Sequence, residues 1–247
     1  MTEELLHYIY FANLGLIALN SILIAFKRFK FVNLLGLIIL ILALGSYFGV
    51  YLYSGHLPVY SKFATLQNIV LIVVLLGLFF NYKRLNQKDN INVFWYVALF
   101  FQAYIITQGF EINDNYYMYD KFYVIGFFQF RILSISLFVF SIVNYIAALR
   151  LKQEPSIQTA LIHRARNFTL LGAGVYLVSE FSGSYWCYLW WGDPWHWSKG
   201  FFLASIMFLL SMLSGHLPQK YLRFVQVKIL LSLLPLALIV LIYLIYH

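Results

Sequence analysis

Apolar runs long enough to cross a lipid bilayer recur along this whole chain, and they constrain its fold more than any other feature. Examples are residues 35–50, 69–80 and 229–246. Each reaches about 20 residues once its mildly polar flanks are included, which is the length that a helix needs to cross the hydrocarbon core. Charged residues make up 11% of the chain, whereas about 25% of a soluble domain is charged. The sequence therefore predicts an integral membrane protein embedded in a lipid bilayer.

The membrane spans are expected to be helices, because lipid offers no partner to an unpaired backbone group. We predict an all-α fold of about eight transmembrane helices, forming a single membrane domain over residues 1–247. The expected helices cover residues 6–26, 31–53, 63–82, 92–108, 122–149, 167–187, 200–216 and 223–246.

Basic residues are distributed unevenly between the connections, and this predicts the orientation of the spans. Of the 17 basic residues, three (Lys62, Lys121 and Lys199) lie in one set of alternate connections, and Arg131 lies inside a span. The other thirteen lie in the remaining connections: Lys27, Arg28, Lys30, Lys83, Arg84, Lys88, Arg150, Lys152, Arg164, Arg166, Lys220, Arg223 and Lys228. Loops rich in Lys and Arg stay cytoplasmic, so both termini are expected outside. The net charge of +8 is explained by these loops, and no nucleic-acid partner is expected.

A tryptophan-rich segment, expected to be an outward loop over residues 183–199, is the most distinctive local feature. It contains five of the six tryptophans, which are Trp186, Trp190, Trp191, Trp195 and Trp197. One interpretation is an interfacial aromatic belt, since Trp favours the membrane surface. The other is a flat aromatic platform, on which a porphyrin can stack. Gly192 and Pro194 would turn the chain so that the rings face the same way.

The stretch Trp191-Gly-Asp-Pro-Trp-His-Trp197 has the W-G-x-x-W-x-W pattern of the WWD motif. The chain here resembles the haem-handling proteins of cytochrome c assembly, namely CcsA (also called ResC), CcmC and CcmF. The ungapped stretch from Ser182 to Lys199 is similar to the CcsA sequence S-G-A-V-W-A-N-E-A-W-G-S-Y-W-S-W-D-P. Residues 55–66, which begin Gly-His-Leu-Pro, resemble the family's G-H-F-P-x-S-N-L-Y-E-S-L. The resemblance covers most of residues 50–216.

The resemblance implies that haem b is handled as substrate or as bound cofactor, and that histidines ligate its iron. His216 falls on the family's intramembrane histidine, and His247 ends the last predicted helix, as an outer histidine does in the family. Taken alone, a histidine at the position of His216 is more often an interfacial or structural residue than a ligand. His56 follows the second predicted helix and either lines or ligates the haem site or is a solvated loop residue. Two positions depart from the family: Ser198 replaces the aspartate that closes the motif, and Phe127 replaces an outer histidine.

Arg131 and Glu180 are charged residues inside predicted spans, where an unpaired charge is costly. Both are expected about 10–14 Å below the outer ends of their helices. We therefore predict that they pair with each other, close to the tryptophans. The pair is either a purely structural salt bridge or a site where Arg131 meets a haem propionate, because its planar guanidinium suits carboxylates.

The first functional hypothesis is a CcsA-like component of cytochrome c biogenesis that presents haem on the outer face. It would contribute to a haem ligation complex with a CcsB-like membrane partner and apocytochrome c. The expected location is a bacterial cytoplasmic membrane or a plastid thylakoid-type membrane. The alternative is a divergent membrane subunit that carries haem for electron transfer or anchors a redox complex. A small-molecule transporter is a third hypothesis, but the spans lack the paired Gly/Pro breaks of that class.

Overall fold

The computed structural model describes residues 3–27, 31–81, 92–110, 112, 120–151, 155–194 and 199–216, together with positions 227, 230, 233, 234 and 237. Within these residues the chain is helical and contains no strand. Its contacts divide it into two compact units, residues 1–120 and residues 121–247. Each unit is described by itself, and the single membrane domain expected over 1–247 stays a prediction.

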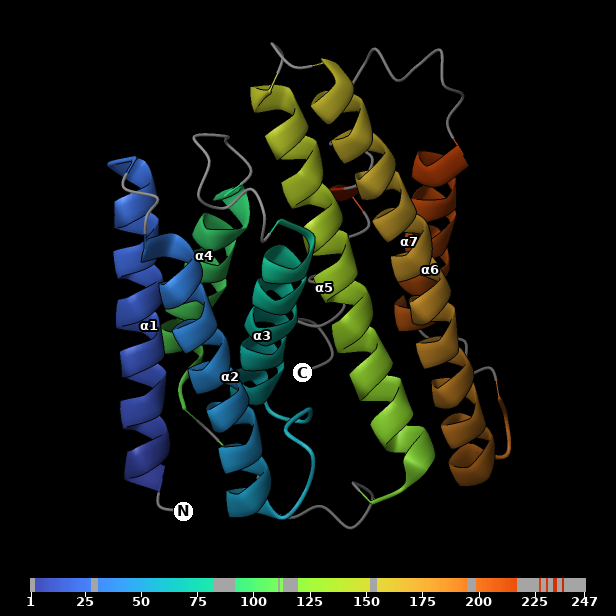
Figure 1. Cartoon of the computed structure of the whole chain (residues 1–247). Coiled ribbons are helices and arrows are strands. Elements are labelled where there is room, and N and C mark those ends of the chain that lie inside the picture. Colours follow the sequence, from blue (N-terminus) through green and yellow to red (C-terminus); the bar gives the residue numbers. More distant parts are fainter. Residues whose placement is uncertain are drawn as a thin grey trace. The chain divides into compact units, whose positions relative to one another are not determined.

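The first seven predicted helices are confirmed, and Figure 1 shows them in chain order. They are α1 (Glu3–Ala25), α2 (Val32–Ser54), α3 (Lys62–Asn81), α4 (Val93–Gln108), α5 (Phe122–Arg150), α6 (Pro155–Trp191) and α7 (Lys199–His216). Most boundaries agree with the prediction to within three residues, because apolar length and the intervening polar segments define them locally. The eighth predicted helix, residues 223–246, lies outside the described residues apart from five positions.

Helix α6 is much longer than predicted, at 37 residues instead of the 21 expected over 167–187. It begins at Pro155, a residue that suits the first turn of a helix because its missing N–H would have no partner there. The predicted helix leaves the basic segment 155–166 in a connection. It is helical nonetheless, since polarity decides whether a segment lies in lipid and does not decide whether it forms a helix.

Four of the described helices are long and apolar enough to cross a membrane, namely α1, α2, α3 and α5. Helix α4 and the segment Phe202–His216 of α7 are apolar but shorter. Many large apolar side chains on these helices are exposed, for example Phe79 at 76% and Ile41 at 66%. Apolar exposure of this kind is expected where lipid replaces water around a helix.

The first unit is a closed ring of four helices, because α1 packs on α2, α2 on α3, α3 on α4, and α4 on α1. One apolar cluster joins all four helices near one end of the ring. We call it the apolar layer; it comprises Leu6 and Tyr10 of α1, Val50 of α2, Phe63 of α3 and Ile105 of α4. Tyr10 also donates its hydroxyl proton to the carbonyl of Gln102, which links α1 directly to α4.

The second unit is organised around the packing of α5 against α6, which lie side by side in Figure 1. Three serine hydroxyls cross between these helices and donate to backbone carbonyls. Ser141 reaches Ala165 over 2.7 Å, Ser134 reaches Gly172 over 2.8 Å, and Ser179 reaches Phe127 over 2.6 Å. The contact positions repeat every seven residues on both helices, as in a left-handed helix pair. Five of these six positions hold Ser, Ala or Gly, and such small residues let the two backbones approach closely.

Candidate functional site

The tryptophan-rich segment begins as helix and not as the expected loop. Helix α6 continues through Trp191, so Trp186, Trp190 and Trp191 all lie on its last two turns. Gly192 ends the helix with a φ of 73°, and its N–H donates to the carbonyl of Tyr188 over 2.9 Å. This left-handed conformation suits glycine, which has no Cβ to clash. Gly192 therefore ends the helix and turns the chain, and the last helical residue, Trp191, lies four residues beyond the predicted end at residue 187.

Aromatic rings from α5 and α6 gather at this end of the second unit. Trp186 contacts Phe127 and Phe128 of α5, with ring centroids 5.9 and 6.4 Å apart, and Trp191 of its own helix at 6.4 Å. Tyr185, next to Trp186 on α6, contacts Tyr123 of α5, with the two ring centroids 5.5 Å apart. We call these six residues the aromatic end cluster.

Exposure separates the three described tryptophans of this segment. Trp186 is partly buried against α5, whereas Trp190 is 43% exposed and Trp191 is 64% exposed. Trp186 therefore belongs to the helix packing, while the other two offer ring surface to a ligand, a partner or lipid. Trp195 and Trp197 were also predicted to belong to this surface, but they lie outside the described residues.

The predicted pairing of Arg131 with Glu180 is confirmed. The Nη2 of Arg131 on α5 donates to the Oε1 of Glu180 on α6. The two side chains are 13% and 27% exposed, so the pair is largely removed from its surroundings. A partly buried ion pair is stable only when both charges stay matched and hydrogen-bonded.

Two aromatic residues frame this ion pair, and sequence reasoning did not assign either of them to it. The guanidinium carbon of Arg131 lies 4.0 Å from the centre of the Phe127 ring and 5.6 Å from that of Tyr176. Phe127 precedes Arg131 by four residues, and Tyr176 precedes Glu180 by four residues. Because residues four apart share a helix face, this spacing was the available signal. Phe127 thus connects the ion pair to Trp186 of the aromatic end cluster.

Two buried N–H groups near this pair have no acceptor among the residues that the structure describes. They are the Nε of Arg131 and the indole Nε1 of Trp186. A buried donor without a partner is costly, so both groups favour an additional acceptor. An anionic oxygen, such as a carboxylate, is the strongest acceptor for a guanidinium.

His56 is a buried residue of the segment between α2 and α3, and not a solvated loop histidine. It is 9% exposed, and its ring lies edge-on to Tyr60 at 5.3 Å. Its Nδ1 lies 3.1 Å from the carbonyl oxygen of Leu57. Because a carbonyl only accepts, the contact with Leu57 requires a proton on Nδ1, and the Ser54 hydroxyl lies 3.5 Å from the same nitrogen.

His216 lies at the last residue of α7 and is exposed. Its Nδ1 lies 2.9 Å from the carbonyl oxygen of Met212, a contact that likewise requires a proton on Nδ1. Helix α7 begins just after the tryptophan-rich segment, and its 18 residues span about 27 Å,. His216 therefore lies at the opposite end of α7 from the aromatic end cluster. Next to it, the Nε of Arg166 on α6 donates to the backbone carbonyl of Gly215 over 2.5 Å.

His56 and His216, which are predicted as metal ligands, belong to different compact units of the chain. No group of three or more His, Cys, Asp or Glu residues capable of holding a metal ion occurs among the described residues. His247 lies outside those residues. A haem iron needs one or two axial ligands, however, and the porphyrin supplies the remaining ones.

Comparison with known proteins gives no independent assignment. The sequence matches no known family model, and no curated protein is significantly similar to it.

Proposed function

We propose that this protein handles haem in cytochrome c biogenesis, presenting haem b on the outer face of a membrane for attachment to apocytochrome c. The observation that carries the proposal is the aromatic end cluster, which gathers Trp186, Trp191 and their α5 neighbours at one end of a helix pair. Offset or tilted aromatic contacts are the favourable way to hold a flat π-system. The WWD-like pattern continues directly from these rings into Trp195 and Trp197.

The groups next to the aromatic end cluster suit the acidic edge of haem. Haem carries two propionates, and the unpaired N–H donors of Arg131 and Trp186 lie close to Phe127. In this proposal a propionate accepts from one or both donors while Glu180 keeps the Arg131 charge matched. The chain's own part is to bind and orient the macrocycle. The thioether chemistry belongs to haem and to the thiols of apocytochrome c.

Histidine ligation is part of this proposal, and the contacts of His56 Nδ1 and His216 Nδ1 with backbone carbonyls support it. A histidine that donates through Nδ1 to a carbonyl presents a fixed Nε2 lone pair, which is the usual arrangement of a metal-ligating histidine. His216 suits a haem-acceptance site away from the tryptophans, while His56 and His247 are candidates for the outer face. A CcsB-like membrane partner would complete the complex.

The proposal includes about eight transmembrane helices with both termini and the tryptophan-rich segment outside. The basic residues of the connections support this orientation. Helix α6 would be about 55 Å long at 1.5 Å per residue, longer than the hydrocarbon core of about 30 Å. Its basic N-terminal turns, with Arg164 and Arg166, would extend from the cytoplasmic surface.

The test is an absorption spectrum of the purified protein in detergent, alone and after addition of haem. Wild-type protein is expected to show a Soret band, and His56→Ala, His216→Ala and His247→Ala are expected to weaken or shift it when the residue is a ligand. His163→Ala is the control, because His163 is an exposed residue of α6 with no proposed role. A wild-type sample without a Soret band, even with added haem, would contradict the proposal.

A second candidate function is a membrane subunit that carries haem for electron transfer or anchors a redox complex. Phe127 favours it, because this side chain stands where the cytochrome c assembly family has an outer histidine and is packed between Arg131 and Trp186. A haem spectrum that is unchanged when reduced apocytochrome c is added, with no haem transferred to its thiols, would select this candidate.

A further inference from the structure

A second polar feature lies inside the four-helix ring of the first unit. One helical turn inward from the apolar layer, each helix of the ring presents one neutral polar side chain. These residues are Asn13 of α1, Ser46 of α2, Gln67 of α3 and Gln102 of α4. We call this set the polar layer.

The residue spacing places these four side chains at one level of the bundle. Asn13 follows Tyr10 by three residues and Gln67 follows Phe63 by four, while Ser46 precedes Val50 by four and Gln102 precedes Ile105 by three. Residues three or four apart lie one above the other on a helix face. Neighbouring helices of the ring run in opposite directions. The polar residue of every helix therefore lies on the same side of the apolar layer, one helical turn further into the bundle.

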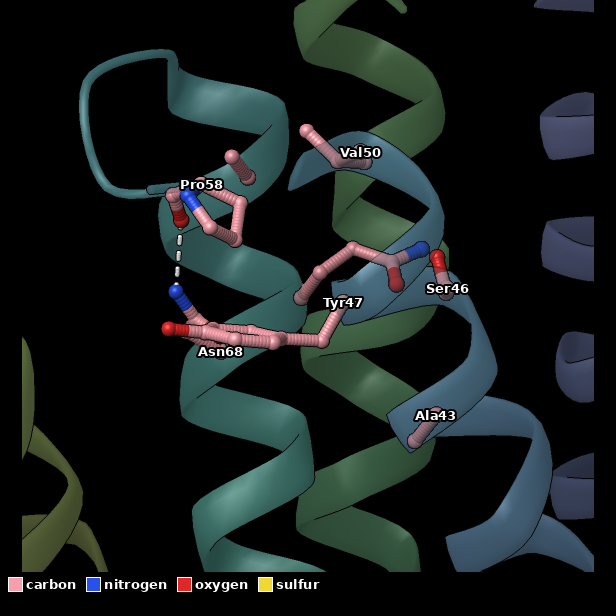
Figure 2. Close-up of a pocket in the computed structure, with 8 residues that line it drawn as sticks. Ala43, Ser46, Tyr47, Val50, Pro58 and Asn68 are labelled. Atoms are coloured by element: carbon pink, nitrogen blue, oxygen red, sulfur yellow. Dashed lines mark hydrogen bonds between the residues drawn. The ribbon is translucent and has the colours of Figure 1, made fainter. Parts of the chain in front are cut away.

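Contacts on two sides of the ring support this level. The hydroxyl of Tyr10 donates to the backbone carbonyl of Gln102, which joins α1 to α4. Ser46 and Gln67 line the same small pocket, which joins α2 to α3. In Figure 2 the pocket is bounded by Ser46, Tyr47 and Val50 on α2 and by Pro58, whose carbonyl accepts from Asn68 over 2.6 Å.

The polar layer is buried, and five of its side-chain polar atoms lack a hydrogen-bond partner among the residues that the structure describes. Asn13 and Ser46 are 1% exposed, Gln67 is 9% exposed and Gln102 is fully buried. The unpaired atoms are the Oδ1 of Asn13, the Oγ of Ser46, the Nε2 of Gln67 and both side-chain polar atoms of Gln102. Each unpaired polar group is costly in the interior of a membrane protein, where bulk water cannot satisfy it.

The chemistry of these atoms selects a neutral guest that both donates and accepts hydrogen bonds. Asn13 Oδ1 and Gln102 Oε1 need donors, the two amide nitrogens need acceptors, and Ser46 can serve as either. No Asp, Glu, Lys or Arg is buried in the described part of this unit, so an ion would lack charge compensation. The pocket has a cavity volume of about 10 Å³. A single water molecule needs roughly 10–15 Å³ of such space, whereas organic ligands occupy pockets of about 300–1,000 Å³.

We infer that the polar layer is a binding site for buried water. The water links the four helices α1, α2, α3 and α4 just below the apolar layer, and it also occupies the pocket at Ser46 and Gln67. A buried water molecule makes about three hydrogen bonds to otherwise unpaired polar groups, and the layer offers five atoms to share. Such waters tie four helices together at one level, where apolar side chains alone would allow them to slide.

The first test is a high-resolution structure of the full chain in lipid nanodiscs, in which ordered water is visible. Single density peaks are expected about 2.7–3.2 Å from Ser46 Oγ and the Gln67 amide. Amide side chains rotated so that the four residues bond directly to one another, with no peak between them, would overturn the inference. So would one continuous density larger than separate waters.

The second test measures the melting temperatures of Ser46→Ala, Gln67→Leu and the double variant in the same nanodiscs. If water bridges the two groups, each single change is expected to lower the melting temperature by a few degrees, and the double variant by less than their sum. If the groups are dry and unpaired, both single changes raise it, which would overturn the inference. Ser136→Ala is the matched control, because its buried hydroxyl already donates to Ile132 of its own helix.

Discussion

The guanidinium carbon of Arg131 lies 4.0 Å from the centre of the Phe127 ring, on its own helix. The same guanidinium donates to Glu180 across the helix interface. A cation over an aromatic face gains about 0.5–2 kcal/mol, the larger values applying where water is excluded. Phe127 thus has two contacts that matter, since its ring also meets Trp186. The Phe127 ring therefore contacts both the Arg131 guanidinium and the tryptophan-rich segment.

Breaking the ion pair from one side is expected to destabilise the protein more than removing both charges. Glu180→Gln leaves the Arg131 charge largely buried and unmatched, so a loss of about 2–4 kcal/mol in the free energy of unfolding is expected. Glu180→Gln combined with Arg131→Met should recover much of that loss. Unfolding in detergent, followed by circular dichroism, measures both.

The control for this prediction is Glu3→Gln on α1, whose carboxylate is 54% exposed and lies 4.0 Å from His7. An exposed pair contributes about 0–1 kcal/mol, so this change should have little effect. Equal losses for Glu3→Gln and Glu180→Gln would contradict the role assigned to burial.

Gly183 is expected to tolerate no side chain. A Cβ at this position would lie 2.6 Å from a ring carbon of Phe127, so Gly183→Ala must push α5 and α6 apart or displace the ring. A loss of about 1–3 kcal/mol is expected, together with a change in the tryptophan emission spectrum, since Phe127 contacts Trp186. Gly174→Ala on the same helix is the control, because nothing lies within 4 Å of its Cβ position. It should be neutral or slightly stabilising, as alanine favours helix over glycine.

Ser134 is expected to contribute to helix packing through its hydroxyl. Ser134→Ala removes the 2.8 Å bond to the carbonyl of Gly172, and the expected cost is about 0.5–1.5 kcal/mol. Ser136→Ala removes a hydroxyl that donates within its own helix and should cost less. A chemical denaturation series on the two variants and the wild type measures the difference. The opposite order would show that the interhelical serine bonds do not stabilise the packing of α5 on α6.

Trp186 and Trp191 are expected to respond differently to truncation. Trp191→Ala removes a ring that is 64% exposed, so haem affinity should fall while the melting temperature stays within about 2 °C of wild type. Trp186→Ala removes a ring packed on Phe127 and Phe128, so both quantities should fall. Phe181→Ala, on the same helix and 77% exposed, controls for loss of exposed aromatic area. Haem titration followed by absorbance measures the affinity. If Trp191→Ala binds haem as tightly as the wild type, Trp191 is not part of the haem site.

Helix positions were largely predictable from the sequence, and the reason is local. Apolar runs of about 20 residues define α1, α2, α3 and α5 without reference to any other part of the chain. The prediction was wrong for α6, where the basic segment after Pro155 and the tryptophans up to Trp191 continue the helix. Both errors have one cause: hydropathy reports where a helix meets lipid, whereas backbone hydrogen bonding decides where it ends.

The candidate site was predictable only in part. Arg131 and Glu180 were correctly paired, because two charges in apolar spans at similar depth have few alternatives. Phe127 was noted in the sequence only as a replacement for a histidine. Its packing between Arg131 and Trp186 depends on the rotation of α5 against α6, and hydropathy carries no information about that rotation.

The sequence by itself determined that this chain forms apolar helices suited to a bilayer, and where most of those helices begin and end. The tertiary structure alone decided which helix faces meet. It places serine–carbonyl hydrogen bonds at every seventh residue between α5 and α6, and aromatic rings around Arg131. It also places four polar side chains at one level of the first unit: Asn13, Ser46, Gln67 and Gln102. The physical reason is that burial in lipid depends on the length and polarity of each segment. Contact between side chains depends on the rotation and axial offset of two helices, which only packing selects.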